Sequence, residues 1–320
     1  MMLLLLAVAV PACAGCHPAE AKSHASTPMM QALMPARDSS VLRDNPELRT
    51  RRGVYEWTLR SSGGDPVYSV SDGKQTVTAK LRWAFGFGVL GQTFVYEKDG
   101  ALYESTMSYY AATKGLDYTP GHVDRPQRNI EEAAGRLIDP AEVRRCFGCH
   151  STGSAEPVNT GVQCSHCHAD TAQHAVSLSK VTKLRQSSSE EISGLCGACH
   201  RTWEDIATNG PKDINNVRFQ PYRLANSKCY DAEDRRISCT ACHEPHTPAS
   251  HVTAGYDAKC LACHTQGNPA QGNRAQGNVC KVGKRDCVTC HMPKTAIPGI
   301  HFGFTDHWIR VVRPGETYPQ

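Results

Sequence analysis

One short pattern, Cys-x-x-Cys-His, constrains this chain most, because it occurs six times between residues 146 and 310. The first cysteines of successive copies lie 18, 32, 43, 21 and 27 residues apart, which is too irregular for a solenoid of equal repeats. In chain order, motifs one to six are Cys146, Cys149 and His150; Cys164, Cys167 and His168; Cys196, Cys199 and His200; Cys239, Cys242 and His243; Cys260, Cys263 and His264; and Cys287, Cys290 and His291.

The pattern is the attachment signature of c-type haem, and its spacing has a physical reason. On a helical turn, positions i, i+3 and i+4 share one face, so two thiols can meet the two vinyl groups of one porphyrin. The next residue, histidine, then lies under the iron as its first axial ligand. The sequence predicts six haem c groups, with a proximal iron ligand in each motif: His150, His168, His200, His243, His264 and His291.

Two other kinds of site also use paired cysteines. A structural zinc site combines one Cys-x-x-Cys with a second ligand pair at a set distance, and no such partner pattern accompanies these motifs. A disulfide scaffold has no need of a histidine after each pair. Zinc and disulfides are therefore the minor alternatives.

A seventh match, Cys13 to His17, follows an apolar run from Met1 to Val10. The run is typical of the apolar part of a secretion signal and is too short to span a bilayer, although no basic residue precedes it. Ala14-Gly15-Cys16 resembles the end of a lipobox, so a lipid anchor at Cys16 or Cys13 is an open alternative. We expect a leader over residues 1–16, a chance match at Cys13, and export to the periplasm, outer membrane or cell exterior.

Two cysteines, Cys229 and Cys280, lie outside the motifs and flank motifs four and five. A free exposed thiol is a liability in an oxidising compartment. We therefore predict a disulfide between them, with two free buried thiols as the alternative.

Six irons need six second axial ligands, and the supply of histidines nearly matches this demand. The candidate distal ligands are His122, His174, His246, His251, His301 and His307. Weaker candidates are His166, Met292, and the early pair His17 and His24. For each histidine, the alternative is a surface or core residue that binds no iron.

The remainder of the chain divides by composition. Residues 17–50 are rich in Ala, Ser, Pro and charge and are predicted to be a flexible tether. Residues 51–122 predict an antiparallel β-rich domain, with turns at Asp72-Gly73 and Asp99-Gly100. Its expected strands are Val54–Leu59, Val67–Val70, Thr76–Trp83, Thr93–Glu97 and Leu102–Tyr109.

A glycine pattern within this domain, Gly86 to Gly91, matches the dinucleotide fingerprint G-x-G-x-x-G. The fingerprint requires a helix to follow, and Gln92–Glu97 predicts a strand instead. A bend between two strands is the better interpretation.

Helical structure is expected after residue 122. Residues 123–145 predict a helical connector in two pieces, the second beginning with Asp139 as N-cap and Pro140 in the first turn. Residues 146–310 then form a mostly helical, loop-rich hexahaem domain, and 311–320 a C-terminal tail. The predicted fold class is α+β. The formal net charge of +4 argues against a nucleic-acid partner.

Several stretches resemble the multihaem cytochromes that include pentahaem nitrite reductase, hydroxylamine oxidoreductase and the tetrahaem electron carrier of ammonia oxidisers. They are Cys146–Thr152, Cys242–His246, Cys290–Lys294 and Phe304–Arg310. The resemblance implies closely stacked haems, and it implies that His246 and His307 are distal ligands to other haems. The nitrite reductases of this group carry Cys-x-x-Cys-Lys at the catalytic haem, whereas all six motifs here end in histidine.

Three functions are compatible with these observations. The first is electron transfer between redox partner proteins, such as other cytochromes or a quinol-oxidising complex, because two histidines on each iron favour outer-sphere transfer. The second is a multihaem oxidoreductase with one open-site haem that acts on a small nitrogen or sulfur compound. The third is a subunit of an extracellular cytochrome filament.

Overall fold

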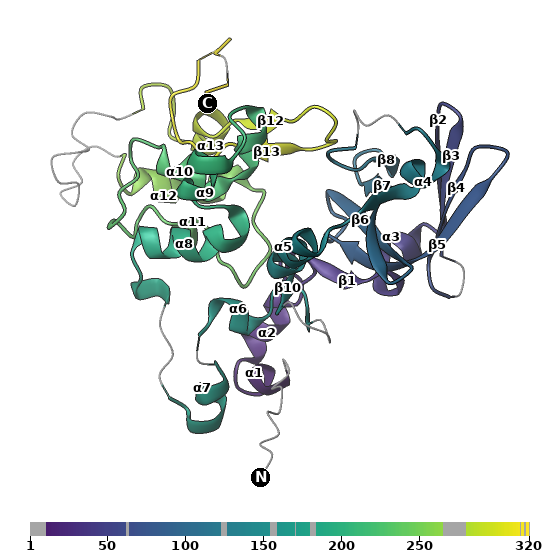
Figure 1. Cartoon of the computed structure of the whole chain (residues 1–320). Coiled ribbons are helices and arrows are strands. Elements are labelled where there is room, and N and C mark those ends of the chain that lie inside the picture. Colours follow the sequence, from purple (N-terminus) through teal and green to yellow (C-terminus); the bar gives the residue numbers. More distant parts are fainter. Residues whose placement is uncertain are drawn as a thin grey trace. The chain divides into compact units, whose positions relative to one another are not determined.

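The computed structural model covers the whole chain and has the α+β architecture expected from the sequence (Figure 1). It describes residues 11–61, 64–122, 127–153, 159–169, 171–179, 184–264, 280–313, 315–316 and 318–319. The chain forms two compact units. Unit 1 comprises Met1–Val181 with Pro298–Phe302, and unit 2 comprises Thr182–Ile297 with Gly303–Gln320.

A nine-stranded antiparallel sheet, counted over the described residues, dominates unit 1. Strands β2 to β8 follow one another in chain order, while β1 pairs with β5 and β9 pairs with β7. The strands are β1 (Leu33–Pro35), β2 (Glu47–Arg52), β3 (Tyr55–Arg60), β4 (Val67–Ser71), β5 (Thr76–Phe85), β6 (Gly91–Lys98), β7 (Ala101–Tyr110), β8 (Gly115–Tyr118) and β9 (Gly135–Leu137). All five predicted strands are present.

Turn chemistry sets the register of this meander. Lys98 pairs with Ala101, so the β6–β7 loop consists of Asp99 and Gly100 alone. Both have positive φ, at 52° and 75°, as a tight hairpin turn requires. The glycine pattern at residues 86–91 is a bend between β5 and β6, as predicted, and no helix follows it.

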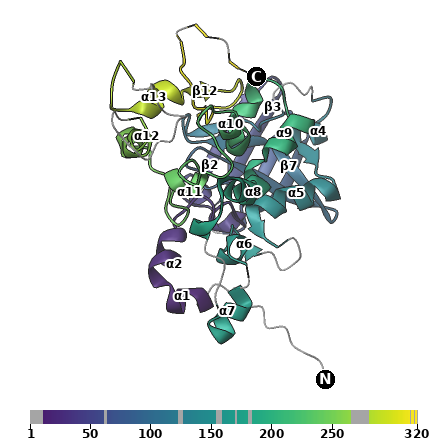
Figure 2. The ribbon, with the colours of Figure 1, turned by 90° about the vertical axis from the view of Figure 1, so that its left-hand side faces the viewer.

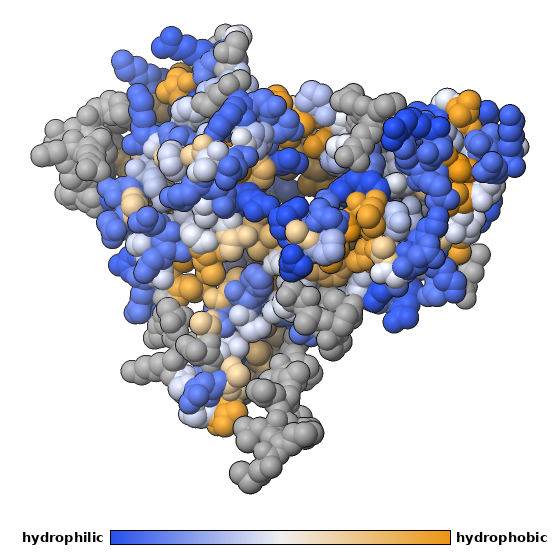
Figure 3. All heavy atoms as spheres, viewed as in Figure 1, coloured by the Kyte–Doolittle hydropathy of each residue, from blue (hydrophilic) through white to orange (hydrophobic). Residues whose placement is uncertain are grey.

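On the face shown in Figure 3, hydrophilic residues predominate, with hydrophobic residues exposed between them. Over the described part of the chain, we find no helix with the length and apolarity needed to span a bilayer.

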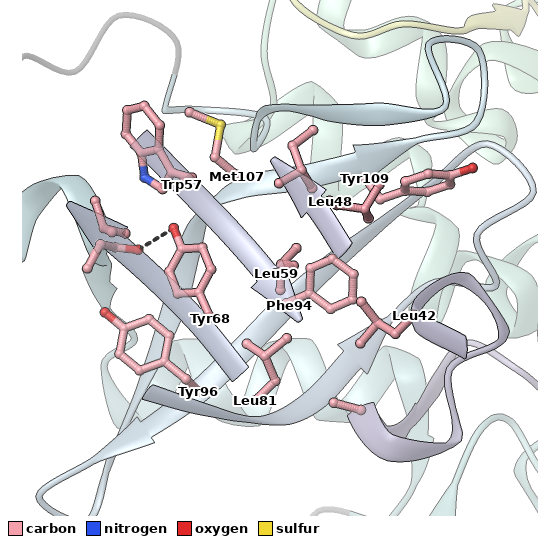
Figure 4. Packing of buried hydrophobic residues seen from close by; sticks show 14 of the residues in the cluster. Leu42, Leu48, Trp57, Leu59, Tyr68, Leu81, Phe94, Tyr96, Met107 and Tyr109 are labelled. Atoms are coloured by element: carbon pink, nitrogen blue, oxygen red, sulfur yellow. Dashed lines mark hydrogen bonds between the residues drawn. The ribbon is translucent and has the colours of Figure 1, made fainter. Parts of the chain in front are cut away.

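Unit 1 has two buried clusters, of which the smaller contains Leu33, Trp83, Val95, Ile138 and Phe147. Large aromatic and aliphatic side chains of the sheet form the main core cluster (Figure 4). Helix α4 (Ile130–Ala134) closes it, because two buried side chains hold its last turn. The indole of Trp57 donates to the carbonyl of Ala133 at 2.7 Å, and the hydroxyl of Tyr68 donates to the carbonyl of Ala134 at 2.9 Å.

The predicted tether is wrong for most of residues 17–50. This segment forms α2 (Pro18–His24), β1, a 3-10 turn η1 (Ala36–Asp38), α3 (Ser40–Asp44) and the start of β2, after α1 (Pro11–Cys16). Its apolar residues belong to the core, including Leu33 and Leu42, which are 1% and 2% exposed. The sheet therefore begins well before residue 51, and β9 extends it beyond residue 122.

The remainder of unit 1 carries motifs one and two. As predicted, a second helix, α5 (Pro140–His150), begins at Asp139, whose carboxylate accepts from the amides of Ala141 and Glu142 at 2.8 Å. Two short strands and two short helices follow: β10 (Ser151–Thr152), β11 (Asn159–Thr160), α6 (Cys164–Cys167) and α7 (Thr171–Ser177). The unit boundary after Val181 thus divides the predicted hexahaem domain.

Unit 2 is helical and loop-rich, and it carries motifs three to six (Figure 2). Its elements are η2 (Leu184–Gln186), α8 (Ser189–His200), α9 (Trp203–Asn209), η3 (Ile214–Arg218), α10 (Gln220–Ala225), α11 (Cys239–Cys242), η4 (Thr253–Tyr256), α12 (Asp257–Leu261), α13 (Cys287–His291), β12 (Lys294–Ala296) and β13 (Gly303–Thr305). Two capping boxes, at Ser188 and Thr202, start α8 and α9.

Candidate haem sites

Each of the six motifs begins on a helical turn, as its spacing predicts. Motifs one and three end long helices, α5 and α8, while motifs two, four and six nearly coincide with the short helices α6, α11 and α13. Motif five starts within α12. The two cysteines of a motif, at i and i+3, therefore lie on one side of a turn, which suits two thioether bonds to a single porphyrin.

Three of the histidines predicted as proximal ligands are held in the same way, through the ring nitrogen that would not bind the iron. The Nδ1 atom of His150 lies 2.9 Å from the carbonyl of Ala32, that of His200 lies 3.1 Å from Oε1 of Gln220, and that of His291 lies 2.8 Å from the carbonyl of Arg310. Each acceptor is an oxygen without a proton, so Nδ1 donates. The Nε2 atom of the neutral ring then keeps its lone pair for a metal, as in other histidine ligand sites.

His243 of motif four faces His307, with ring centres 6.2 Å apart. An imidazole nitrogen binds a metal at about 2.0–2.1 Å and its ring centre lies about 1.1 Å beyond, so two axial imidazoles on one iron hold their centres about 6.2–6.4 Å apart. The Nδ1 atom of His307 is 3.0 Å from the carbonyl of Thr305. His307, predicted as a distal ligand, is therefore placed opposite the proximal histidine of motif four.

Burial keeps both of these rings neutral. It lowers the pKa of His307 to about 4, and burial followed by repulsion from His200 lowers the pKa of His243. A neutral imidazole has the free lone pair that iron requires. The donor set of this site thus fits a haem iron with two histidine ligands.

A salt-bridged segment positions His307. Asp306 and Arg223 are fully buried and joined by two hydrogen bonds of 2.8 and 2.9 Å, and Arg310 reaches the same carboxylate at 2.7 Å. The backbone amide of Asp306 donates to the carbonyl of Pro293, just after motif six. Strand β13 ends just before Asp306 and pairs with β12, which follows motif six. The segment around His307 is therefore held both by this strand pair and by the ion pairs of Asp306.

A second pair of facing rings lies in unit 1. His174 on α7 is 6.3 Å from His17, centre to centre, and its Nδ1 lies 2.6 Å from the carbonyl of Ser179. The sequence predicts His174 as a distal ligand of one of the six motifs. Its partner here is instead His17, the histidine of the seventh match, which lies at the start of the predicted tether.

His246 has the same anchoring, with Nδ1 at 2.8 Å from the carboxylate of Glu244. It follows motif four by three residues and is partly exposed. It stays a candidate distal ligand.

Two other predicted distal ligands, His122 and His301, are anchored through the opposite nitrogen. The Nε2 atom of the buried His122 lies 3.0 Å from Glu104, and that of His301 lies 2.8 Å from Asp117, with its ring against Tyr110. These carboxylates are hydrogen-bonded to the ring nitrogen that would bind iron. In this structure both histidines therefore make structural contacts with residues of the sheet. His251 is exposed.

Thiols of different motifs contact one another. Cys239 of motif four hydrogen-bonds with Cys196 of motif three, which lowers its pKa. Burial and then hydrogen bonds with Asp257 and Cys260 raise the pKa of Cys287 in motif six to about 12. Motifs three and four, and motifs five and six, are thus paired through their first cysteines.

Asp257 holds the second of these pairs together. It begins α12, which leads into motif five, while its carboxylate accepts from the backbone amides of Asp286 and Cys287 at 2.8 and 2.9 Å. It therefore caps the first turn of motif six from the helix of motif five.

The predicted disulfide is absent, because Cys229 and Cys280 are each a free cysteine. Both residues are exposed overall, although the protein around the sulfur of Cys229 partly shields it from water. Burial raises the pKa of Cys229, followed by smaller effects that include Cys260 and Cys263, so this thiol lies near motif five. Among the described residues no group of three or more histidine, cysteine or acidic side chains is arranged to hold a single metal ion.

Apolar side chains are exposed next to several candidate ligands. Val176 and Leu178, beside His174, are 86% and 76% exposed, and Trp203, three residues after His200, is 47% exposed. A porphyrin face is apolar, so a bound haem would shield such side chains from water. Their exposure fits a protein in which haem supplies much of the apolar interior.

Comparison with known proteins gives one informative match. No family model and no curated protein sequence matches this chain. A solved structure, the crystal structure of the outer cell wall cytochrome OcwA, is similar with a TM-score of 0.55. The similarity covers 95% of this chain and 79% of OcwA at 14% sequence identity. The chain therefore shares its fold with a cytochrome from an outer cell wall.

Proposed function

We propose that this chain is an exported multihaem c-type cytochrome that carries electrons between redox partner proteins, with one haem at each of its six motifs. The observation that carries this proposal is the pair His243 and His307. Their spacing of 6.2 Å, and the position of His307 opposite an attachment motif, match two axial ligands of one iron.

Haem supplies reversible one-electron chemistry at its iron, and the residues of this chain decide how that chemistry can be used. A histidine on each side of a bound iron, such as His243 and His307, would leave no position for a substrate. The Nδ1 hydrogen bonds hold the rings in place, so little rearrangement is needed when the charge on the iron changes. Both effects favour a carrier over a catalyst.

The contacts between motifs support a route for electrons through unit 2. The first cysteines of motifs three and four are hydrogen-bonded, as are those of motifs five and six. Cys242 of motif four and Cys260 of motif five also lie close enough to affect each other's charge, since Cys260 contributes, after burial, to the raised pKa of Cys242. From motif three to motif six, each motif therefore lies close to the next one along the chain.

The structural neighbour supports export. It is described as an outer cell wall cytochrome, and covalent haem attachment to cysteines would place this chain in the same kind of compartment. The apolar run at Met1–Val10 agrees with a secretion signal.

One observation favours a second candidate function. The Nε2 atoms of His122 and His301 are engaged by carboxylates, so the supply of distal ligands is smaller than the sequence suggested. A motif without a second ligand would leave one side of its iron open, as in a multihaem oxidoreductase that acts on a small nitrogen or sulfur compound.

Low-temperature EPR of the fully oxidised, matured protein, quantified against haem iron, tests the proposal. We expect every haem to be low-spin. If about one haem in six is high-spin, an open site exists and the carrier role gives way to the oxidoreductase, for which hydroxylamine, nitrite and sulfite are the first substrates to assay.

A further inference from the structure

We propose that Cys13, Cys16 and His17 hold a further covalent haem, with His174 as its second axial ligand. This inference rests on the proposed function, because it uses the same cofactor and the same attachment chemistry. It replaces the assignment of this match to chance, and it excludes a lipid on Cys13 or Cys16 because the same thiols are consumed.

The local geometry is that of the other six motifs. Helix α1 (Pro11–Cys16) places Cys13 and Cys16 one turn apart, and the amide of His17 donates to the carbonyl of Cys13 at 2.8 Å. The turn therefore continues through His17, and the two thiols and the imidazole share one side of it.

The second ligand is already in position. The ring centres of His17 and His174 are 6.3 Å apart, against 6.2 Å for His243 and His307. In both pairs the second histidine donates from Nδ1 to a backbone carbonyl, of Ser179 and Thr305 respectively. The two pairs thus share both the spacing and the anchoring expected of iron ligands.

A contact with motif two repeats the pairing seen in unit 2. Burial raises the pKa of Cys164, followed by its interaction and hydrogen bond with Cys13. The first cysteine of motif two therefore contacts Cys13 as Cys239 contacts Cys196 and Cys287 contacts Cys260. With this addition, six of seven motifs form three pairs.

The chain after His17 is packed against the segment that leads into motif two. The Nε2 atom of His24 lies 2.8 Å from the carbonyl of Val162, whose amide donates to the carbonyl of Met29 at 3.0 Å. A Cβ on Gly161 would overlap the carbonyl of Met30, so the two backbones touch. Figures 1 and 2 show α1 and α2 beside α6 and α7.

The attachment chemistry balances without another reactant. Each thiol adds across one haem vinyl group: Sγ bonds to the carbon next to the ring and the thiol hydrogen goes to the terminal carbon. No oxidant is consumed and no group leaves. Signal cleavage after Ala12, where Val10 and Ala12 fit the small-residue rule, would leave both thiols on the mature protein.

Intact mass and haem content of the matured protein test the proposal. We expect seven haems in the unaltered protein and six in the double variant Cys13→Ala/Cys16→Ala. The matched control, Cys229→Ala/Cys280→Ala, removes two thiols outside the motifs and should retain seven. Six haems in the unaltered protein overturn the inference, whereas a protein without covalent haem at any motif overturns the proposed function itself.

Two further readouts do not depend on how well the double variant folds. Tryptic digestion of the unaltered protein should yield a haem-bearing peptide that ends at Lys22; a mature chain that starts after His17, or a lipid on this peptide, contradicts the proposal. In His174→Ala, we expect EPR to show one additional high-spin haem per molecule, and the neighbouring Gln173→Ala variant should show none. An unchanged spin state in His174→Ala removes His174 from the site.

Discussion

Arg223 and Asp306 form a two-point ion pair in which both side chains are fully buried, 83 residues apart in the chain. The guanidinium also donates to Asn216 and Pro319, and its Cζ lies 4.9 Å from the ring centre of Trp308 and 4.6 Å from that of Tyr318. The C-terminal tail thus completes the surroundings of the pair. Since Asp306 precedes His307, this pair links the stability of unit 2 to the position of a predicted axial ligand.

Replacing Arg223 should therefore be costly. In Arg223→Leu the buried carboxylate of Asp306 loses its main partner, and removing one member of a buried pair typically costs about 3–5 kcal/mol. Urea unfolding checks this. Arg236→Leu is the matched control, because its pair with Asp234 is largely exposed and should contribute no more than about 1 kcal/mol. Equal losses in both variants would contradict the importance of the buried pair.

The same pair predicts a pH dependence. Burial acts to raise the pKa of Asp306, but hydrogen bonds from Arg223 and the amide of Trp308 outweigh it and lower the pKa. A carboxyl with a depressed folded-state pKa contributes stability above its unfolded value, about 3.9, and loses it as pH falls through the folded value. The difference in unfolding free energy between the unaltered protein and Asp306→Asn should be constant near neutral pH and shrink below about pH 4. A difference that stays constant in acid would contradict this sign.

The two modes of histidine anchoring predict opposite results on substitution. His307→Ala removes a ring anchored through Nδ1 and should convert one haem to high-spin, as seen by EPR. His301→Ala removes a ring anchored through Nε2 to Asp117 and should leave every haem unchanged. A high-spin signal in His301→Ala would show that this histidine moves onto an iron when haem is bound.

Helix α4 depends on two hydrogen bonds from the sheet. Trp57→Phe keeps most of the buried ring but leaves the carbonyl of Ala133 without its donor, which should cost about 1–3 kcal/mol. Thermal unfolding of the whole protein measures this loss of stability. Val54→Ala, at a position in the same unit that is 64% exposed, is the control and should change stability by about 0.5 kcal/mol or less.

Local patterns predicted the parts of this structure that depend on local chemistry. Alternating side chains and the Asp99-Gly100 turn define the meander, and the i, i+3, i+4 spacing defines the attachment motifs. The resemblance to known multihaem cytochromes singled out His307, which lies opposite His243.

Such local patterns could not predict contacts between segments that are far apart in the sequence. His150 is anchored by Ala32, 118 residues away, and His301 by Asp117, 184 residues away. No periodicity connects these positions, so the histidine count alone could not separate ligands from structural residues. The apolar run before Cys13 likewise favoured a leader, although the signal that could have identified a seventh site, a complete Cys-x-x-Cys-His, was present.

We propose that this chain holds covalent haems and passes electrons among them. Coulometric reduction of the matured protein, followed by reoxidation with a one-electron acceptor such as ferricyanide, measures both properties together. We expect one electron to be taken up per attached haem, and all of them to be returned to the acceptor in the absence of any substrate. A chain that carries no covalent haem, or a reduced protein that ferricyanide cannot reoxidise, would contradict the proposed role as an electron carrier.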